Sequence, residues 1–276
     1  MSGKLAIVAG SGDLPKRLLE ACRASGRPVF VLALEGHTDR ALVAGVPHAW
    51  IRLGAATDAF AALRAAEVSD VVFVGPVKRP SLTSLMPDMR AAKFLARVGL
   101  RSFGDDGLLS AIVKEFEAEG FHVVGVDDVL ADLVAPTGAV GRLMPDDAAK
   151  GDIARGLAVV RALGALDIGQ AAVVEAGVVL GVEAIEGTDA LIERAGKLKR
   201  EGARRGVLIK AKKPGQERRV DLPTIGVDTV ARVAAAGFAG IAIEAGAALI
   251  VDRDEVARRA DEAGLFVVGI AAGDAA

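Results

Sequence analysis

The sequence predicts an α/β protein with two domains, and three observations lead to that prediction. Short apolar runs alternate with amphipathic runs through about the first 125 residues, a rhythm typical of a parallel sheet with helices on both faces. Residues 129–147, which contain Pro, Gly and Asp, interrupt the rhythm. The alternation then resumes, which predicts a parallel-sheet domain over residues 1–135 and a second α/β domain over residues 136–276.

Local patterns predict each element of the first domain. KLAIVAG, PVFVLALEG, DVVFVGPV and FHVVGV are short apolar runs next to Gly or Pro, as buried strands are. LPKRLLEACRASG and DAFAALRAAEV predict helices, the first of which ends at Gly26. A third helix, DDGLLSAIVKEFEAEGF, carries Leu108, Ile112 and Phe116 on one face and ends at Gly120. This order of strands and helices is Rossmann-like.

The second domain is predicted in the same way. DDAAKGDIARGLAVVRALG reads as a helix with acidic residues in its first turn, and QAAVVEAGVVLGVEAIEG as two strands around Gly177. GTDALIERAGKLKREG predicts a helix and GVLIKAKKPG a strand that enters a turn. The segments GVDTVARVAAAG, GIAIEAG, ALIVDRDEVARRADEAG and LFVVGI complete the α/β unit.

Composition excludes several classes of protein. The chain has 52% hydrophobic residues and a net charge of −2, so it has ample core and no global field that would recruit DNA. Nine Phe, one Trp and no Tyr argue against a base-stacking surface for single-stranded nucleic acid. We therefore expect no nucleic-acid partner, and basic residues matter only where they cluster.

Cysteine and targeting signals indicate a cytoplasmic protein. The single cysteine, Cys22, cannot form a disulfide framework or a Cys-based zinc site. The N-terminus does not resemble a signal peptide, and no apolar run reaches the roughly 20 residues of a membrane span. The three histidines have no ligand spacing, and neither a G-x-S-x-G elbow, an H-E-x-x-H motif nor a Walker loop is present.

The stretch AGSGDLP follows the first strand and opens the first helix. Gly10, Ser11 and Gly12 would let backbone amides approach a phosphate at a helix N-terminus, and Glu35 after the second strand could hold a ribose hydroxyl. The third glycine of the dinucleotide fingerprint is missing. The alternative is a tight strand–helix turn with Asp13 as the cap.

Two cations and a run of flexible apolar residues follow the strand DVVFV. Lys78 and Arg79 come where α/β proteins present ligands, beyond the carboxyl end of a strand. The residues that follow them are either core beneath a loop, which we favour, or a groove for an acyl chain: Leu82, Leu85, Met86, Met89 and Phe94.

Acidic residues gather at two places. Glu183, Glu186 and Asp189 lie around a predicted strand–helix corner, where three oxygen donors would suit a hard ion such as Mg²⁺. Capping explains Asp189, whereas Glu183 in an apolar strand needs a cation or a donor. Asp105 and Asp106 precede a helix, which favours capping over a metal role.

The stretch KAKKPGQERRVDLPTIG, residues 210–226, is the most unusual in the chain. Five of its first ten residues are Lys or Arg, and a single carboxylate, Asp221, then precedes Leu-Pro. A solvated hairpin tip would account for Lys213, Glu217 and Arg218, but not for DLPTIG. Lys210 lies in an apolar strand and should point toward a partner. Lysines, a carboxylate and a helix N-terminus together suit a polyphosphate and its metal.

These motifs, in this order, resemble one family throughout. AGSGDLP, FVGPVKRP, SFGDDGLLSAIVKEFEAEGF, VEAIEGTD and KAKKPGQERRVDLPTIGVDT cover nearly the whole chain and are similar to the LpxI-type UDP-2,3-diacylglucosamine pyrophosphatases of lipid A biosynthesis. The resemblance implies a Mg²⁺-dependent hydrolase that yields UMP and 2,3-diacylglucosamine 1-phosphate. It also implies that the ligand is held in a cleft between the two domains, and it suggests attack at the phosphorus on the sugar side.

The resemblance also implies roles for individual residues. Asp221 would hold the metal or activate water, with Asp189 as a further metal ligand. Glu186 and Lys210 would be catalytic, and Lys210 and Lys212 would neutralise the diphosphate. The remaining substrate contacts would come from a third group of residues: Gly10, Ser11, Gly12, Lys78, Thr188 and Thr224.

Two other functions remain open on the residues alone. An NAD(P)-dependent oxidoreductase would use the AGSG loop, and a non-catalytic sugar-nucleotide binding protein would bind without turnover. For partners, the resemblance implies the diacylated UDP-sugar and transient contact with the cytoplasmic face of the inner membrane. The apolar C-terminal stretch LFVVGIAAG suggests a homodimer.

Overall fold

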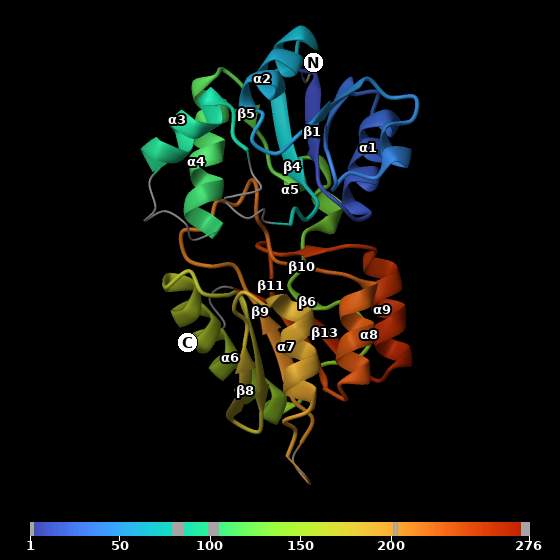
Figure 1. Ribbon diagram of the computed structural model, residues 1–276. Helices are drawn as coiled ribbons and strands as arrows, with labels where there is room; N and C mark the ends of the chain where they lie inside the picture. Colours follow the sequence, from blue (N-terminus) through green and yellow to red (C-terminus); the bar gives the residue numbers. More distant parts are fainter. Residues whose placement is uncertain (1–2, 79–85, 99–104, 201, 203, 272–276) are drawn as a thin grey trace. The chain divides into compact units, whose positions relative to one another are not determined.

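The computed structural model describes residues 3–78, 86–98, 105–200, 202 and 204–271. The chain divides into two compact units (Figure 1). One contains Met1–Ala131 and Glu217–Asp221, and the other contains Asp132–Gln216 and Leu222–Ala276. Both units combine sheets with packed helices, which confirms the predicted two-domain α/β fold.

The first unit is built on a five-stranded sheet in which every neighbouring pair is parallel. Its order, β3-β2-β1-β4-β5, is the Rossmann-like order that the sequence predicts. Because all strands run the same way, their carboxyl ends share one edge, and the predicted nucleotide loop leaves the sheet there. The strands are β1 (Leu5–Ala9), β2 (Val29–Leu34), β3 (His48–Ile51), β4 (Asp70–Val74) and β5 (His122–Val123).

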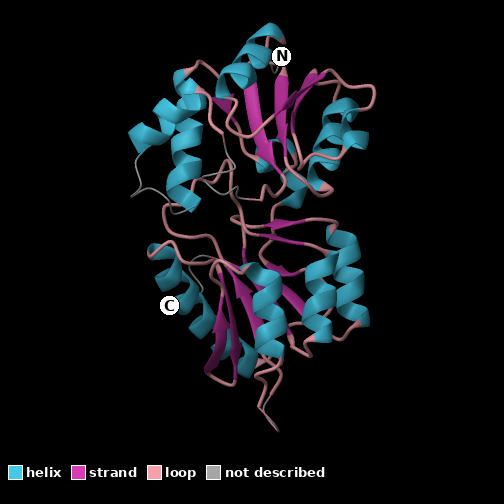
Figure 2. Cartoon of the chain, in the orientation of Figure 1, coloured by secondary structure: helices cyan, strands magenta, loops and turns pink. Residues whose placement is uncertain are grey.

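Helices cover both faces of this sheet (Figure 2). One face packs on α2 through a cluster that includes Phe60 and Leu63, and α1 contacts β1 and β2 through a different set of side chains. The helices are α1 (Leu14–Ala24), α2 (Ala56–Ala65), α3 (Met89–Val98), α4 (Asp105–Ala118) and α5 (Val126–Val129), with a 3₁₀ turn at Arg40–Val43.

Three features of the first unit differ from the sequence prediction. The strand β3 and the helix α3 were not expected, and β5 is only two residues long because the chain turns into α5 directly after Gly125. Met86 and Met89 are exposed, so the interpretation of these two side chains as core was wrong. Arg79, Leu82 and Leu85 lie outside the described residues.

The second unit contains a mixed six-stranded sheet of order β6-β13-β11-β9-β7-β8 and a small parallel pair, β10-β12. The three central strands β9, β11 and β13 are parallel, and β6, β7 and β8 are antiparallel to their neighbours. The strands are β6 (Gly138–Ala139), β7 (Ala171–Glu175), β8 (Val178–Val182), β9 (Val207–Lys210), β10 (Thr224–Ile225), β11 (Gly240–Glu244), β12 (Leu249–Ile250) and β13 (Phe266–Ile270).

The faces of the large sheet are covered by different helices. Ile153, Leu157 and Val160 of α6 pack on one face, and Leu191, Val230 and Val256 bring the three other helices onto the opposite one. The helices are α6 (Asp147–Ala165), α7 (Gly187–Gly196), α8 (Val227–Ala235) and α9 (Arg253–Glu262), and Ala131–Leu133 forms a 3₁₀ turn.

Two predictions for the second unit have clear outcomes. The strand pair around Gly177 is confirmed as the antiparallel hairpin β7–β8, with Gly177 in the left-handed region at φ +77°. The apolar stretch that suggested a homodimer is strand β13, whose Phe266, Val267 and Val268 are buried in the core of the unit itself. Its apolar character therefore no longer supports a dimer, and the dimer stays a prediction.

Candidate functional site

The glycine loop after β1 is held against the end of β4. The amide of Gly10 donates to the carbonyl of Val74 at 2.8 Å, and the amide and hydroxyl of Ser11 both donate to the carbonyl of Pro76, at 3.0 and 2.9 Å. Two backbone donors that were predicted to approach a phosphate are thus used inside the protein. The predicted nucleotide contact of Gly10, Ser11 and Gly12 stays a prediction.

Close backbone packing explains why glycine occupies this loop. A Cβ added at Gly10 would lie 2.3 Å from the carbonyl oxygen of Gly75, and one at Gly75 would lie 2.5 Å from that of Ser11. Gly12 adopts φ +84°, which L-residues rarely do. Asp13 occupies the N-cap position of α1, but its side chain makes no capping hydrogen bond. The loop is therefore a closely packed turn that leads from β1 into α1 and lies against the end of β4.

Lys78 lies at the same edge of the sheet, after β4, and is exposed. His37 joins it to the loop after β2, since its Nε2 lies 3.3 Å from the carbonyl oxygen of Lys78 and its Nδ1 lies 3.1 Å from that of Glu35. The carboxyl edge of the first sheet thus brings together Lys78, Glu35 and the glycine loop.

The acidic corner between β8 and α7 contains one buried carboxylate. Glu183 accepts from the amide of Gln170 at 3.0 Å and from the hydroxyl of Thr188 at 2.7 Å. These two donors confirm that Glu183 needs polar partners in its apolar surroundings. They also use the hydroxyl of Thr188, which was predicted to bind substrate.

The other two acids of the corner pair with arginines. Glu186 contacts Arg194 at 2.8 Å, and hydrogen bonds from its own amide and from Arg194 lower the pKa of this exposed carboxyl. Asp189, in the first turn of α7, lies 3.2 Å from Arg232. Glu186 occupies the N-cap position of α7 without a capping hydrogen bond from its side chain, and the capping role of Asp189 stays a prediction.

The expectation that these three acids form a metal site is wrong for the described part of the chain. Within the residues that the structure describes, no group of three His, Cys, Asp or Glu side chains is placed to hold a metal ion. The reason is that donors already engage both oxygens of Glu183, and arginines engage the two other acids. The side chains of Asp105 and Asp106 lie outside the described residues.

Lys210, at the carboxyl end of β9, is only 7% exposed, and its Nζ donates to the carbonyl of Thr224 at 3.2 Å. The prediction that this lysine points toward a partner is confirmed. Lys212 is half-buried, and its amide donates to Glu244 at the end of β11. Thr224 lies in β10, and its hydroxyl donates to the carbonyl of Leu222, so its predicted substrate contact stays a prediction.

The prediction that Lys213 lies at a solvated hairpin tip is wrong. Lys213 is 6% exposed, and its Nζ lies 2.7 Å from Asp167, which follows α6. Its amide donates to the side chain of the buried Gln216 at 2.9 Å. These contacts fix the loop that follows β9 against the end of α6.

Asp221 belongs to the first unit, unlike the lysines that precede it in the stretch. Its amide donates to the carbonyl of Glu217 at 3.2 Å, so it closes a single turn. The predicted site residues therefore come from both units. Those in the first are Gly10, Ser11, Gly12, Lys78 and Asp221, and those in the second are Glu186, Thr188, Asp189, Lys210, Lys212 and Thr224.

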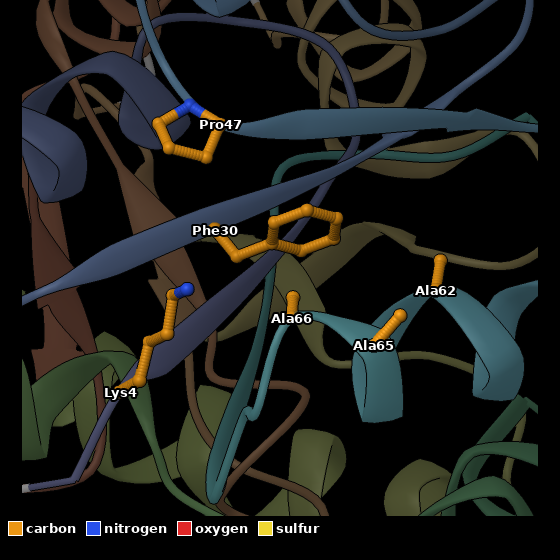
Figure 3. A pocket seen from close by; sticks show the side chains of 6 residues that line it. All are labelled: Lys4, Phe30, Pro47, Ala62, Ala65 and Ala66. Carbon is orange, nitrogen blue, oxygen red and sulfur yellow. The ribbon is translucent and has the colours of Figure 1, made fainter.

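Two surface hollows lie away from these residues. One, with a volume of about 360 Å³, opens at the edge where the strands of the first sheet begin and is lined by Lys4, Phe30, Pro47 and three alanines (Figure 3). The other, of about 330 Å³, includes Asp152, Arg204 and Arg205 of the second unit. Neither lining includes a predicted site residue, and both belong to the edge opposite the strand ends that carry the candidate site.

The sequence analysis did not single out the acids that pair with the basic stretch. Arg218 contacts Asp127, Arg219 contacts Glu117, and Lys213 contacts Asp167. The spacing in sequence gave no signal for the first two, because 91 and 102 residues separate the partners. The five cations of the stretch, with few acids beside them in sequence, were instead attributed to a polyphosphate.

In the part of the chain that the structure describes, no helix is both long enough and apolar enough to cross a membrane.

Known proteins resemble the chain along nearly its whole length. Residues 4–133 match the family described as LpxI N-terminal domain, and residues 136–268 match the LpxI C-terminal domain. Over 274 residues the chain is 46% identical to a Caulobacter vibrioides protein named UDP-2,3-diacylglucosamine pyrophosphatase LpxI, with 97% of each chain covered.

Two solved structures show only a remote likeness. An Aspergillus clavatus N5-carboxyaminoimidazole synthase with ADP and 5-aminoimidazole ribonucleotide is 13% identical with a TM-score of 0.25, over 73% of this chain and 45% of that one. A carboxyaminoimidazole ribonucleotide synthase of the same organism with ATP is 14% identical with a TM-score of 0.23, over 72% and 45%. TM-scores this low carry no argument about fold or function.

Proposed function

Because the chain belongs to the LpxI family, we propose that it hydrolyses the pyrophosphate of UDP-2,3-diacylglucosamine in a metal-dependent reaction of lipid A biosynthesis. The observation that carries the proposal is the 46% identity, over 97% of both chains, to a protein named for this activity. The chain is a UDP-2,3-diacylglucosamine diphosphatase. The two alternatives, an oxidoreductase and a non-catalytic binding protein, are set aside.

The reaction adds water across one phosphoanhydride bond. A water oxygen forms a new bond to one phosphorus, the bridging P–O bond breaks, and the products are UMP and 2,3-diacylglucosamine 1-phosphate. The family resemblance favours attack at the phosphorus on the sugar side, so that UMP is the leaving group. The protein must neutralise the charge of the pyrophosphate, position the water and hold the leaving phosphate in line.

Lys210 is suited to charge neutralisation because it is a buried cation at the end of a parallel strand. A cation in a water-excluded position interacts with a phosphate oxygen more strongly than an exposed one does. Its hydrogen bond to the carbonyl of Thr224 fixes the direction of the ammonium group. Lys212, which is more exposed, would complete the neutralisation, and Glu186 stays a predicted catalytic residue of the second unit.

Asp221 is the carboxylate that we assign to water activation or metal binding. Mg²⁺ commonly binds one or two carboxylates together with substrate phosphates, so Asp221 would suffice as a protein ligand without a cluster of three, and the role of Asp189 as a further ligand stays a prediction. When bound, Mg²⁺ would offset the negative charge of the pyrophosphate and lower the pKa of water. In the water-activating role, the Asp221 carboxylate would accept a hydrogen bond from the attacking water and orient the lone pair of that water toward phosphorus.

The substrate carries two acyl chains, which favours a site of action beside a membrane. We therefore propose that the protein is cytoplasmic and makes transient contact with the cytoplasmic face of the inner membrane. A diacylated substrate partitions into a bilayer because each buried methylene contributes about 0.8 kcal/mol. The enzyme would then meet its substrate at the lipid surface.

Hydrolysis in ¹⁸O-labelled water tests the proposal. The purified chain is incubated with UDP-2,3-diacylglucosamine and Mg²⁺, and both products are analysed by mass spectrometry. We expect equal amounts of UMP and diacylglucosamine 1-phosphate, with the label in the latter. Label in UMP would overturn the assignment of the attacked phosphorus, and no hydrolysis with any divalent metal would overturn the proposed reaction.

A further inference from the structure

Residues Glu217–Asp221 form a single turn that belongs to the first unit, although the residues on either side of it belong to the second. The amides of Val220 and Asp221 both donate to the carbonyl of Glu217, each at 3.2 Å. The backbone of Asp221 therefore moves with the turn as a whole. Whatever fixes the turn also fixes the position of the Asp221 carboxylate.

Arg218 fixes one side of this turn. Its Nε and Nη2 donate to the same oxygen of Asp127 in α5, at 3.0 and 2.7 Å. The Asp127 side chain is only 9% exposed, so the pair is partly shielded from solvent. Gly125 leaves room for the Asp127 carboxylate, because a Cβ at Gly125 would lie 2.3 Å from its Oδ1. The local structure thus presents Asp127 to the arginine.

Arg219 fixes the other side of the turn. Its Nη1 lies 2.5 Å from Glu117 in α4, and its Nε and Nη2 each donate at 2.8 Å to a different oxygen of Glu217. A planar guanidinium that bridges two carboxylates sets both distance and orientation, which an ammonium group does not. These hydrogen bonds raise the pKa of Arg219 and lower that of Glu217.

We propose that Arg218 and Arg219 are positioning residues for Asp221, which they hold by clamping its turn to α5 and α4. The inference rests on the proposed role of Asp221 in hydrolysis. Catalytic groups lose efficiency when they move by a fraction of an ångström, whereas partly exposed ion pairs contribute little to stability. Loss of the clamp should therefore lower turnover much more than it lowers the stability of the fold.

The rival interpretation is that the two arginines bind the pyrophosphate directly. The two interpretations differ in what Asp127 does. If Arg218 is part of a clamp, Asp127 is required, and swapping the two charges between positions 127 and 218 should preserve the ion pair. If Arg218 instead binds phosphate, Asp127 only reduces the attraction of Arg218 for phosphate, and the swap would place a carboxylate where the phosphate binds.

A charge-reversal cycle separates these interpretations, with UMP release measured as kcat and KM. We expect Arg218→Glu and Asp127→Arg each to lower kcat about 100-fold with KM changed less than threefold, which corresponds to lost transition-state positioning. The double variant should recover at least tenfold in kcat. Arg218→Lys keeps the positive charge but loses the planar pair of donors that contacts Asp127. Its kcat should therefore be intermediate, about tenfold below wild type.

Arg258→Glu is the matched control. Arg258 is 50% exposed and pairs with Glu255 and Glu262 on α9, while Arg218 is 49% exposed. The control makes the same change of charge at a similar exposure in the second unit. It should leave kcat within twofold of wild type, and a larger loss would show that any reversed surface arginine slows the enzyme, which would overturn the proposal.

Hydrogen exchange of the peptide that covers residues 217–222 gives a readout that does not need activity. We expect faster exchange at the Asp221 amide in Arg218→Glu and recovery in the double variant. UMP release by the wild-type protein tests the proposed reaction itself. Absence of UMP release would therefore contradict the proposed function, whereas the hydrogen-exchange result tests the clamp separately. The clamp is overturned if exchange is unchanged, if the double variant recovers nothing, or if KM rises while kcat holds.

Discussion

The two arms of the basic stretch have similar composition and different attachments. Lys210 ends β9, Lys212 and Lys213 follow it, and the second unit holds them through Thr224, Glu244 and Asp167. Arg218 and Arg219, a few residues later, pair with Asp127 and Glu117 of the first unit. The comparison shows that a run of positive charge in sequence need not be one functional surface. The lysines of the stretch lie at or beside the end of β9, whereas its arginines attach the turn Glu217–Asp221 to α5 and α4.

The largest expected effect in the lysine arm is at Lys210. Lys210→Met keeps the length of the side chain and removes the buried charge, so kcat for UMP release should fall about 100-fold, as when a single stabilising donor is removed from an active site. Steady-state kinetics measures this loss. Lys197→Met, at an exposed position after α7, is the control and should be within twofold of wild type. Full activity in Lys210→Met would remove this arm from the catalytic site.

Substitutions at the adjacent residues Lys212 and Lys213 should have different effects, with activity reduced more at Lys212 and stability reduced more at Lys213. Lys212 is half-buried and is assigned to the diphosphate, so Lys212→Met should lower kcat/KM about tenfold. Its free energy of unfolding should change by less than about 0.5 kcal/mol. Kinetics and urea unfolding of the same sample measure the two quantities.

Lys213→Met should lower the free energy of unfolding more than it lowers kcat/KM. It removes the partner of Asp167 inside a shielded pair, and we expect a loss of about 2 kcal/mol in the free energy of unfolding. The effect on kcat/KM should be smaller than for Lys212→Met. Equal effects of the two variants on both quantities would show that the loop does not divide in this way.

The smallest expected effect concerns pH and the arginine arm. Hydrogen bonding to Arg219 lowers the pKa of Glu217 below its ordinary value in the folded chain. The pair therefore stabilises the fold above the ordinary glutamate pKa of about 4.3, and this contribution is lost as pH falls through the lowered pKa.

Glu217→Gln measures that contribution. The variant should be less stable than wild type by under about 1 kcal/mol at pH 7, and the gap should close in strong acid. Thermal unfolding at a series of pH values measures the gap. A gap of the same size at every pH would show that the Glu217 charge does not stabilise the turn.

Local patterns predict most of the fold because short-range physics determines these elements. The parallel sheet of the first unit, the hairpin at Gly177 and the long helix α6 all follow from apolar periodicity and turn residues. The strand β3 was missed because it has four residues and only its last, Ile51, is fully buried. The exposure of Met86 and Met89 was missed because apolar residues are usually assigned to a core.

The candidate site was less predictable because its contacts are long-range. Sequence analysis correctly inferred that Lys210 and Glu183 need partners, since burial of charge without them is costly. It placed Lys213 in solvent because the Pro-Gly turn beside it usually is exposed, and Asp167 lies 46 residues away. No local pattern reveals that the turn at Glu217–Asp221 belongs to the first unit, because its partners are about 100 residues distant.

UMP release from UDP-2,3-diacylglucosamine by wild type and Asp221→Asn, with Mg²⁺ and after chelation by EDTA, tests the central claim most directly. Asn keeps the size of the side chain and removes the charge that would orient water or hold the cation. The account predicts rapid release by wild type with Mg²⁺, none after chelation, and a loss of at least 1,000-fold in the variant. Full turnover by Asp221→Asn would contradict it.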